Sequence, residues 1–229
     1  MELNPLPSWD LDATLATFRN GTFHGVFKGL ELQKSDDDLE RYRTLVDESN
    51  PDLLIETGTR AGGSALWFHD ELNLQVLSID VAPQFSRGAP RGKYLEFLVG
   101  SSLGDAAVRH VAEKLAKDKG LRVMVSLDAD HHSPHVQAEI STWAPFVSPG
   151  CYLVVEDACF DLFARKGLKD EARIGGSKIP EIGGTLDALE RNFGVPTYVS
   201  TLFWRDQWLE AQTPVSHSPV GWWRRHESA

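Results

Sequence analysis

Carboxylate side chains gather directly after two short apolar runs of this sequence. Asp128 and Asp130 follow one run, and Glu156 and Asp157 follow the next. Residues two apart on an extended chain share a face, and the two runs are expected to form neighbouring strands, so the four carboxylates converge. Like charges at short range repel unless a cation lies among them, and oxygen ligands suit Mg²⁺ before Ca²⁺. The alternative is that some of these carboxylates point apart and are solvated at the edge of the sheet.

Three histidines, His131, His132 and His135, lie close to this predicted cation site. Histidine clusters can bind zinc, but neighbouring histidines diverge and the carboxylates fit a hard oxygen site better. His131 suits the role of a general base, because an imidazole with a pKa of about 6.5 can accept a proton near neutral pH. A surface or helix-capping histidine is the alternative.

A glycine-rich stretch, 56–64, follows another apolar run. Gly58, Gly62 and Gly63 let the backbone turn tightly and approach a nucleotide-like ligand. Asp80 ends the next predicted strand, where it could accept hydrogen bonds from ribose hydroxyls. The GxGxxG fingerprint of dinucleotide-binding folds is absent, and the acid that opens the stretch would repel phosphate but attract a sulfonium or ammonium group. This charge favours S-adenosylmethionine over a dinucleotide; the alternative is an ordinary strand-to-helix turn with a solvated Asp80.

The elements that must position these residues alternate along the chain. Short apolar runs predict strands buried on both faces, and stretches with helical periodicity separate them. The predicted strands cover 53–55, 76–79, 94–99, 123–127 and 152–155, and two further β-rich stretches cover 198–203 and 215–225. The predicted helices cover 65–72, 105–115, 134–143 and 185–193. A further helix begins at the capping box of Ser35. This alternation predicts a parallel α/β sheet wrapped by helices, with ligands bound beyond the carboxyl ends of the strands.

Two segments show no clear periodicity. Residues 1–34 are expected to form an arm or a lid, and residues 158–183 a long loop at the substrate. Loops of that length in compact domains are usually functional or disordered. The whole chain, 1–229, has a size that parallel α/β folds reach without splitting, so a single domain is expected.

Composition excludes some classes of partner. There are 23 Lys and Arg residues against 33 Asp and Glu, whereas a nucleic-acid-binding surface needs clustered basic residues. No apolar run is long enough to span a bilayer and no signal peptide is evident, so we expect a cytoplasmic protein without a membrane partner.

Cys151 and Cys159 are expected to be reduced thiols. The tryptophans among residues 204–223 could pack in the core or an interface, or form walls for a ring-shaped substrate.

Together these motifs resemble the cephalosporin hydroxylase-type family of class I S-adenosylmethionine-dependent methyltransferases, which includes sugar and antibiotic O-methyltransferases. The similarity rests on residues 34–35, 51–65, 78–80, 127–131, 147–150, 152–157 and 218–225. It implies a Rossmann-like fold with a mostly parallel seven-stranded sheet and helices on both faces. It also implies S-adenosylmethionine as methyl donor, a divalent metal, usually Mg²⁺, bound by an Asp and an acidic pair, and a homo-oligomer.

The resemblance implies three sets of site residues. The metal ligands would be Glu156 and Asp157 together with Asp128 or Asp130, and analogy with catechol O-methyltransferase-like sites favours Asp128. The proton acceptor would be His131 or the free member of the Asp128 and Asp130 pair. The donor-binding positions would be Glu56, Thr57, Gly58, Gly62, Gly63, Ser64, Asp80, Ser101, Ser102 and Asp128.

The implied reaction is Mg²⁺-dependent methylation of a hydroxyl of a small molecule, a sugar or a natural-product (antibiotic) intermediate. Two departures leave the acceptor open. His131-His132 doubles a histidine that the family pattern shows once, and the residues after Asp157 include Lys and Phe where many relatives have Asn and Gly. The alternatives are N-methylation of an amino sugar or other amine, a donor-binding protein without catalysis, and a catalyst that keeps the nucleotide only for structure.

Overall fold

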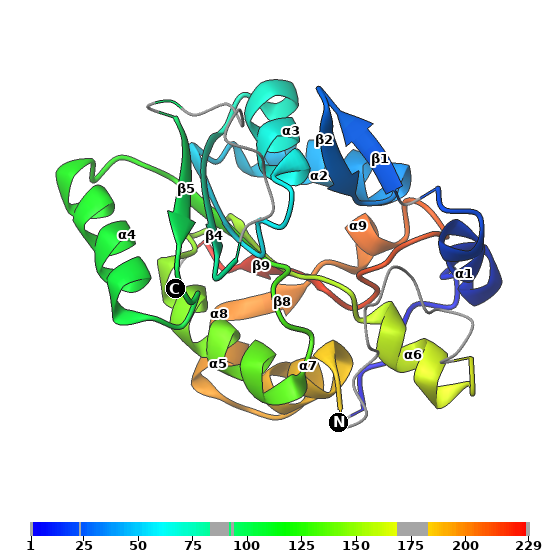
Figure 1. Ribbon diagram of the computed structural model, residues 1–229. Coiled ribbons are helices and arrows are strands. Elements are labelled where there is room, and N and C mark those ends of the chain that lie inside the picture. Colours follow the sequence, from blue (N-terminus) through cyan, green and yellow to red (C-terminus); the bar gives the residue numbers. More distant parts are fainter. Residues whose placement is uncertain (1, 23, 83–91, 93, 169–182, 228–229) are drawn as a thin grey trace.

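A seven-stranded sheet forms the centre of the protein, whose computed structural model describes residues 2–22, 24–82, 92, 94–168 and 183–227 (Figure 1). The strand order is β5-β4-β3-β6-β7-β9-β8. The first five of these strands run parallel, and β9 is antiparallel to β7 and β8. The strands are β3 (Leu53–Thr57), β4 (Gln75–Asp80), β5 (Leu95–Val99), β6 (Val123–Leu127), β7 (Tyr152–Val155), β8 (Phe203–Arg205) and β9 (Trp222–Arg225).

Helices cover both faces of the sheet. Figure 1 shows α2 and α3 on one side and α4, α5 and α7 on the other. These helices are α2 (Asp36–Ser49), α3 (Gly63–Leu72), α4 (Asp105–Lys117), α5 (Ser133–Trp143) and α7 (Thr185–Phe193), and a 3-10 turn, η1 (Ala144–Phe146), follows α5. The predicted mostly parallel α/β sheet with helices on both faces is confirmed, as are the five predicted strands before residue 156 and the helices between and around them.

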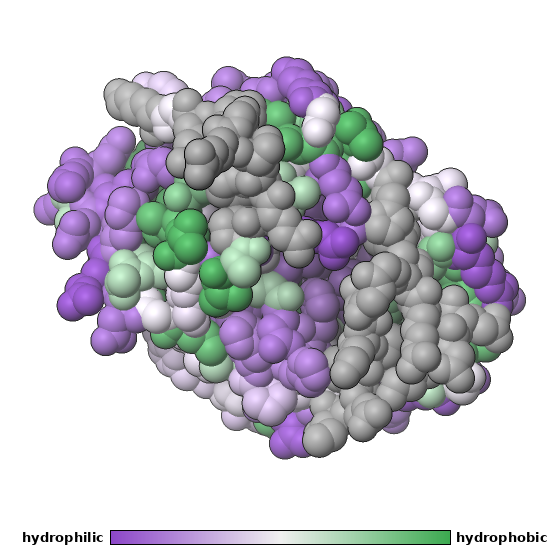
Figure 2. Space-filling view, viewed as in Figure 1, coloured by the Kyte–Doolittle hydropathy of each residue, from purple (hydrophilic) through white to green (hydrophobic). Residues whose placement is uncertain are grey.

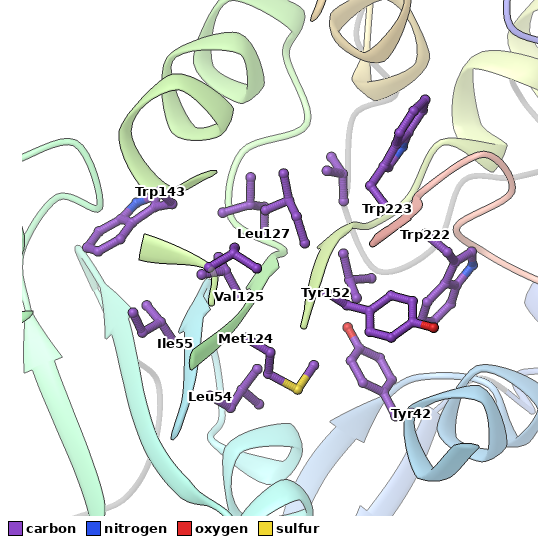
Figure 3. Close-up of a cluster of buried hydrophobic side chains, with 14 of the residues drawn as sticks. Tyr42, Leu54, Ile55, Met124, Val125, Leu127, Trp143, Tyr152, Trp222 and Trp223 are labelled. Carbon is purple, nitrogen blue, oxygen red and sulfur yellow. The ribbon is translucent and has the colours of Figure 1, made fainter. Parts of the chain in front are cut away.

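The core lies between the central strands and these helices. Every residue of β3, β6 and β7 is buried, which explains why their sequences are mostly apolar. Figure 3 shows Tyr42 of α2 beside Trp222 of β9, and their rings meet edge to face with centroids 5.3 Å apart. The hydroxyl of Tyr42 is thereby carried into the middle of the sheet, toward the polar residues described below.

Residues 1–34 contain secondary structure that the sequence left unassigned. Helix α1 (Leu11–Arg19) begins at Asp10, whose side chain accepts a hydrogen bond from the amide of Ala13 at 2.9 Å. A two-stranded hairpin, β1 (His24–Phe27) and β2 (Leu30–Gln33), follows and packs against α3. The N-terminal segment therefore lies against the fold through two separate elements.

The prediction of a long loop over residues 158–183 was wrong for its first part. Helix α6 (Cys159–Arg165) occupies it, too short for helical periodicity to be recognised in sequence. The carboxylate of Asp161 accepts hydrogen bonds from the amides of Gly184 and Leu186, at 2.8 and 2.6 Å, and so ties α6 to the start of α7. Residues 169–182 of the predicted loop lie outside the described residues.

The predicted β-rich stretches near the C-terminus also need correction. Residues 198–202 form a helix, α8 (Tyr198–Leu202), because Thr197 and Ser200 make a capping box that outweighs the β-propensity of this segment. A second short helix, α9 (Gln207–Glu210), follows β8, and in the stretch 215–225 the strand is confined to β9.

Hydrophilic side chains cover the outer surface of α4, and others occupy the recessed centre of the face seen in Figure 2. Among the described residues, no helix combines the length and apolar character needed to cross a membrane.

Candidate active site

The candidate site lies where the strand order reverses, at the carboxyl ends of β3 and β6. Thr57, the last residue of β3, pairs with Ile79 of β4 and with Leu127 of β6. The three strands therefore end at one level, where Asp80 is the last residue of β4 and Asp128 follows β6. This point in an open parallel sheet is the usual place for a ligand.

Two glycines let neighbouring segments close around this point. Gly58 has φ of +85°, and a Cβ on it would lie 1.8 Å from the carbonyl oxygen of Asp128. A Cβ on Gly63 would lie 2.1 Å from the carbonyl oxygen of Glu31 in the hairpin. Only glycine fits at these positions, so the turn after β3 lies directly against the start of the β6–α5 loop, and α3 lies directly against β2.

Glu56 is the buried acid at the base of the glycine turn. Ser64 and Ser78 donate hydrogen bonds of 2.5 Å to its two carboxylate oxygens. Burial raises the pKa of Glu56 to about 7, although the charge of Lys34 and the two serine hydrogen bonds lower it. The carboxyl group can therefore gain or lose a proton near neutral pH, and a cationic ligand beside it would favour the charged form.

The other predicted donor-binding residues lie along the same edge. The carboxylate of Asp80 accepts hydrogen bonds from the amides of Arg60 and Ala82, each at 2.8 Å, which fixes its orientation at the end of β4. Ser102 is buried and Ser101 is exposed, both just beyond β5. The roles of Glu56, Thr57, Gly58, Gly62, Gly63, Ser64, Asp80, Ser101, Ser102 and Asp128 in donor binding stay predictions.

Asp128, His131 and Asp157 form a compact group across the ends of β6 and β7. Their ligand atoms lie within 4.8 Å of one another, the one such group of metal-ligating side chains in the described part of the chain. Nε2 of His131 lies 3.2 Å from Oδ2 of Asp157 and 3.8 Å from Oδ1 of Asp128. Asp157 has φ of +64°, a left-handed conformation that is uncommon for non-glycine residues but more accessible to Asp than to most.

The electrostatics of this group favour an added positive charge. Burial raises the pKa of Asp128 to about 6 and also raises the pKa of Asp157, so keeping these carboxylates ionised costs free energy. Burial alone would lower the pKa of His131, but the negative charges of Asp157 and Asp128 raise it above the usual value. In this arrangement the protonated imidazole compensates the carboxylates, a role that a metal ion could take.

Glu156 does not join this group but faces into the protein. Its Oε1 atom lies 2.6 Å from Nζ of Lys34 and also accepts hydrogen bonds from Tyr42 at 2.6 Å and Ser126 at 2.8 Å. Lys34 reaches Oδ2 of Asp128 as well, at 2.9 Å. The sequence pattern gives no chemical role to Lys34 or Tyr42, because a lone lysine before a helix cap normally lies in solvent.

Asp130 and His132 lie outside the group, at its solvent side. Nδ1 of His132 lies 2.5 Å from Oδ1 of Asp130, whose side chain is 51% exposed. Of the carboxylates predicted to converge, the structure therefore brings together Asp128 and Asp157 and separates Asp130 from them, while Glu156 is linked to Asp128 through Lys34. His135 lies apart from His131 as well, 3.4 Å from Glu139 on the same helix. A zinc site built from the three histidines is not formed.

Aromatic side chains of α1 and α6 border the group on one side. The ring of Phe160 lies 6.2 Å from that of His131 and 5.3 Å from that of Phe18, centroid to centroid. Phe18 in turn lies 4.4 Å from the buried ring of His217. The N-terminal helix, remote in sequence, thus contributes to the wall beside the candidate site.

The residues present fit the two groups that the sequence suggests. Oxygen atoms of Asp128 and Asp157 with an adjacent imidazole form a donor set suited to Mg²⁺ or Mn²⁺. The buried carboxyl group of Glu56, beside a turn that leaves no room for a Cβ, suits a cationic nucleotide-like ligand better than a phosphate.

Comparison with known proteins adds independent findings. A profile of the family described as Rhamnosyl O-methyltransferase/CmcI matches residues 21–177. Rhamnosyl O-methyltransferase of Mycobacterium bovis is 33% identical over 138 residues, which cover 58% of this chain and 56% of that protein. The same identity and length hold for the protein of Mycobacterium leprae, with coverage of 58% and 60%. The alignments thus span little more than half the length of these curated relatives.

Solved structures share the fold at low sequence identity. The apo structure of CmcI aligns with a TM-score of 0.57 at 17% identity, over 88% of this chain and 76% of CmcI. CmcI with Mg and SAM aligns with a TM-score of 0.54 at 16% identity, over 87% and 75%. The MycE methyltransferase from the mycinamycin biosynthetic pathway, in complex with Mg and SAH, gives 0.53 at 16% identity, over 94% of this chain and 54% of MycE. The fold is that of the class I methyltransferases.

Proposed function

We propose, since the chain belongs to the Rhamnosyl O-methyltransferase/CmcI family, that it transfers a methyl group from S-adenosylmethionine to a hydroxyl group of a small molecule. The acceptor class would be a sugar or a natural-product intermediate of the antibiotic type. The reaction would depend on Mg²⁺. Relatives named for rhamnosyl O-methylation, and solved relatives named for Mg with SAM or SAH, support this proposal.

One observation carries the proposal: the glycine turn and the carboxylate group touch. Gly58, two residues beyond Glu56, lies directly against the backbone of Asp128, in the group with His131 and Asp157. A donor on the turn and an acceptor at the carboxylate group would therefore be neighbours. Direct transfer needs this proximity, because much of its rate comes from holding the two reactants in line.

The residues of the turn would hold the donor. The ionised carboxylate of Glu56 would attract its α-ammonium group, and Asp80 would accept hydrogen bonds from its ribose hydroxyls. Ser101 and Ser102 would lie near its adenine. The arrangement of Glu56 supports this assignment, because Ser64 and Ser78 hold its carboxylate in a fixed position.

Asp128 and Asp157 would hold the metal ion, with Glu156 and Asp130 as further candidate ligands. The short distances within the group support the first two. Bound S-adenosylmethionine supplies an electrophilic methyl group, and bound Mg²⁺ lowers the pKa of an acceptor hydroxyl. His131, or the free member of the Asp128 and Asp130 pair, would take the hydroxyl proton as the new C–O bond forms. The C–S bond of the donor would break in the same step, and its electron pair would stay on sulfur.

Two segments that are far apart in the sequence of the predicted single domain would enclose the acceptor. We propose that the N-terminal segment 1–34 and the segment 158–183 act as an arm and a substrate loop. The position of Phe18 and Phe160 beside His131 supports this, because the two rings come from these segments. Their apolar faces would suit one face of a ring-shaped acceptor.

The test is a methyl-transfer assay with isotopically labelled S-adenosylmethionine, Mg²⁺ and a panel of rhamnosides, other deoxysugars and amino sugars. Labelled methyl on an acceptor oxygen, abolished by chelation and restored by Mg²⁺, would support the proposal. Methylation of an amine that survives chelation would instead indicate N-methyltransfer. Donor binding by calorimetry without transfer to any acceptor would favour a binding protein without catalysis.

Assembly and location are further expectations. We propose a homo-oligomer, supported by the exposure of Tyr198 (71%), Trp204 (40%) and Trp208 (63%) around the edge strand β8. Light scattering at several protein concentrations would test it. We also propose a cytoplasmic location, supported by the free thiols of Cys151 and Cys159. Immunoblotting of cell fractions would test the location.

A further inference from the structure

Lys34 lies in an unusual place for a lysine, between two acidic residues inside the protein. Only 1% of its side chain is exposed. Its ammonium nitrogen lies 2.9 Å from Oδ2 of Asp128 and 2.6 Å from Oε1 of Glu156. It comes from the short link between β2 and α2, far in sequence from both partners.

The surroundings keep this ammonium charged. Burial alone would lower the pKa of Lys34, but the charges of Asp128, Glu156 and Glu56 raise it well above the ordinary value. Glu156 is held by Tyr42 and Ser126 at the same time, through the oxygen atom that contacts Lys34. An unpaired buried ammonium would be strongly destabilising, so its retention here depends on these carboxylates.

Asp128 divides its two oxygen atoms between this lysine and the candidate metal site. Oδ2 accepts from Lys34, whereas Oδ1 faces His131. A cation held by Asp128 and Asp157 would therefore lie one carboxylate away from the ammonium of Lys34. Two positive charges at that separation repel each other, and they do so more strongly inside a protein than in water.

We propose that Lys34 is the internal counter-cation of the carboxylate cluster: it stabilises the metal-free protein and weakens the binding of a divalent ion at Asp128 and Asp157. This inference rests on the proposed metal site. It extends the proposed function, because it makes Lys34 a positioning residue that sets metal affinity without touching the acceptor.

The experiment measures Mn²⁺ binding by electron paramagnetic resonance, and thermal unfolding with and without Mn²⁺, for the wild type and Lys34→Met. Lys28→Met is the matched control, because it removes the same charge from a lysine that is 59% exposed on the hairpin. We expect Lys34→Met to bind Mn²⁺ about tenfold more tightly, since a repelling charge is gone. Its Tm should be lower without metal, and Mn²⁺ should raise that Tm more than it does in the wild type.

A second variant separates charge from packing. In Lys34→Met/Glu156→Gln the unpaired carboxylate is neutral, so the metal-free Tm should recover part of the loss and Mn²⁺ affinity should return toward the wild-type value. A double variant no more stable than Lys34→Met would overturn the counter-cation role, and so would equal or weaker Mn²⁺ binding by Lys34→Met. If neither the wild type nor Lys34→Met bound Mn²⁺, the proposed metal site would fall together with this inference. If the wild type bound Mn²⁺ and Lys34→Met bound it more weakly, this inference would fall but the proposed function would stand.

Discussion

The two halves of the candidate site are built in different ways. The donor half is mostly a local structure: Glu56, Gly58, Gly62 and Ser64 span the end of β3, the turn after it and the start of α3, and β4 adds Ser78 and Asp80. The acceptor half is assembled from segments far apart in the chain. Lys34, Tyr42, Asp128, Glu156 and Phe160 meet there from five different elements or links.

The donor half therefore has a fixed geometry, whereas the acceptor half has a charge that can change. The donor half has one buried acid, with both oxygens satisfied by serines. The acceptor half has three acidic residues, a lysine and a histidine within mutual reach, so every change of charge alters the others. Changes in the donor half should therefore act on one ligand, whereas changes in the acceptor half should act on metal, proton and stability together.

The largest effect is expected for Asp157→Asn. This change removes a charge from the metal-binding group while keeping the shape of the side chain, so Mg²⁺-dependent methyl transfer should fall by about 10²-fold or more. Steady-state assays over a range of Mg²⁺ concentrations measure it, alongside calorimetry of S-adenosylmethionine binding. The matched control is Asp47→Asn, an exposed acid of α2. A loss of donor binding as large as the loss of activity would contradict the separation of the two halves.

Gly58→Ala should affect both halves of the site at once. Its Cβ would overlap the carbonyl group of Asp128, and its φ of +85° disfavours any side chain, so stability should fall by at least ~2 kcal/mol and both ligands should bind more weakly. Urea unfolding and the two binding assays measure these effects. Gly21→Ala controls for backbone strain alone, since Gly21 has φ of +69° with no atom within 4 Å of the added Cβ. Equal losses in the two variants would show that the contact with Asp128 is unimportant.

The turn of the donor half and the central sheet are predictable because their signals are local. A buried parallel strand appears as an apolar run, and the glycines after β3 stand where the turn requires them. The fold class and the strands from β3 to β7 therefore follow from the amino-acid sequence alone. Helices α6 and α8 do not, since a short helix shows little periodicity and capping at Thr197 decides against the β-propensity of residues 198–202.

The acceptor half is predictable only in outline, for a physical reason. Strand ends place Asp128, Asp130, Glu156 and Asp157 near one another, but a side chain's direction depends on its partners. Glu156 faces inward because Lys34, Tyr42 and Ser126 satisfy its oxygen there, and Asp130 faces outward beside His132. No local pattern shows that Lys34 would be buried, since its partners lie 94 and 122 residues away.

A smaller effect is expected for Glu56→Gln, and it should be confined to the binding of the donor. Loss of the negative charge should weaken S-adenosylmethionine binding by roughly tenfold at pH 8 and much less at pH 6, where the carboxyl group with its pKa of about 7 is already mostly protonated. Calorimetric titrations at the two pH values measure this. Mn²⁺ binding should stay within about twofold, and Glu113→Gln, an exposed acid of α4, is the control. A pH-independent loss would mean that Glu56 does not bind the donor through its charge.

The smallest effect concerns stability without ligands. Burial raises the pKa of Glu56 from 4.5 to about 7, so the folded protein holds a proton that the unfolded chain releases at lower pH. The resulting stabilisation is complete below pH 4.5 and is lost as the pH rises through 7, with a slope of at most ~1.4 kcal/mol per pH unit for one proton. Asp128 and Asp157 act in the same direction, so the quantity to measure is the difference in unfolding free energy between the wild type and Glu56→Gln. Between pH 5 and 8 the wild type should lose stability relative to Glu56→Gln. A constant difference over this range would show that Glu56 is ionised throughout and carries a permanent charge.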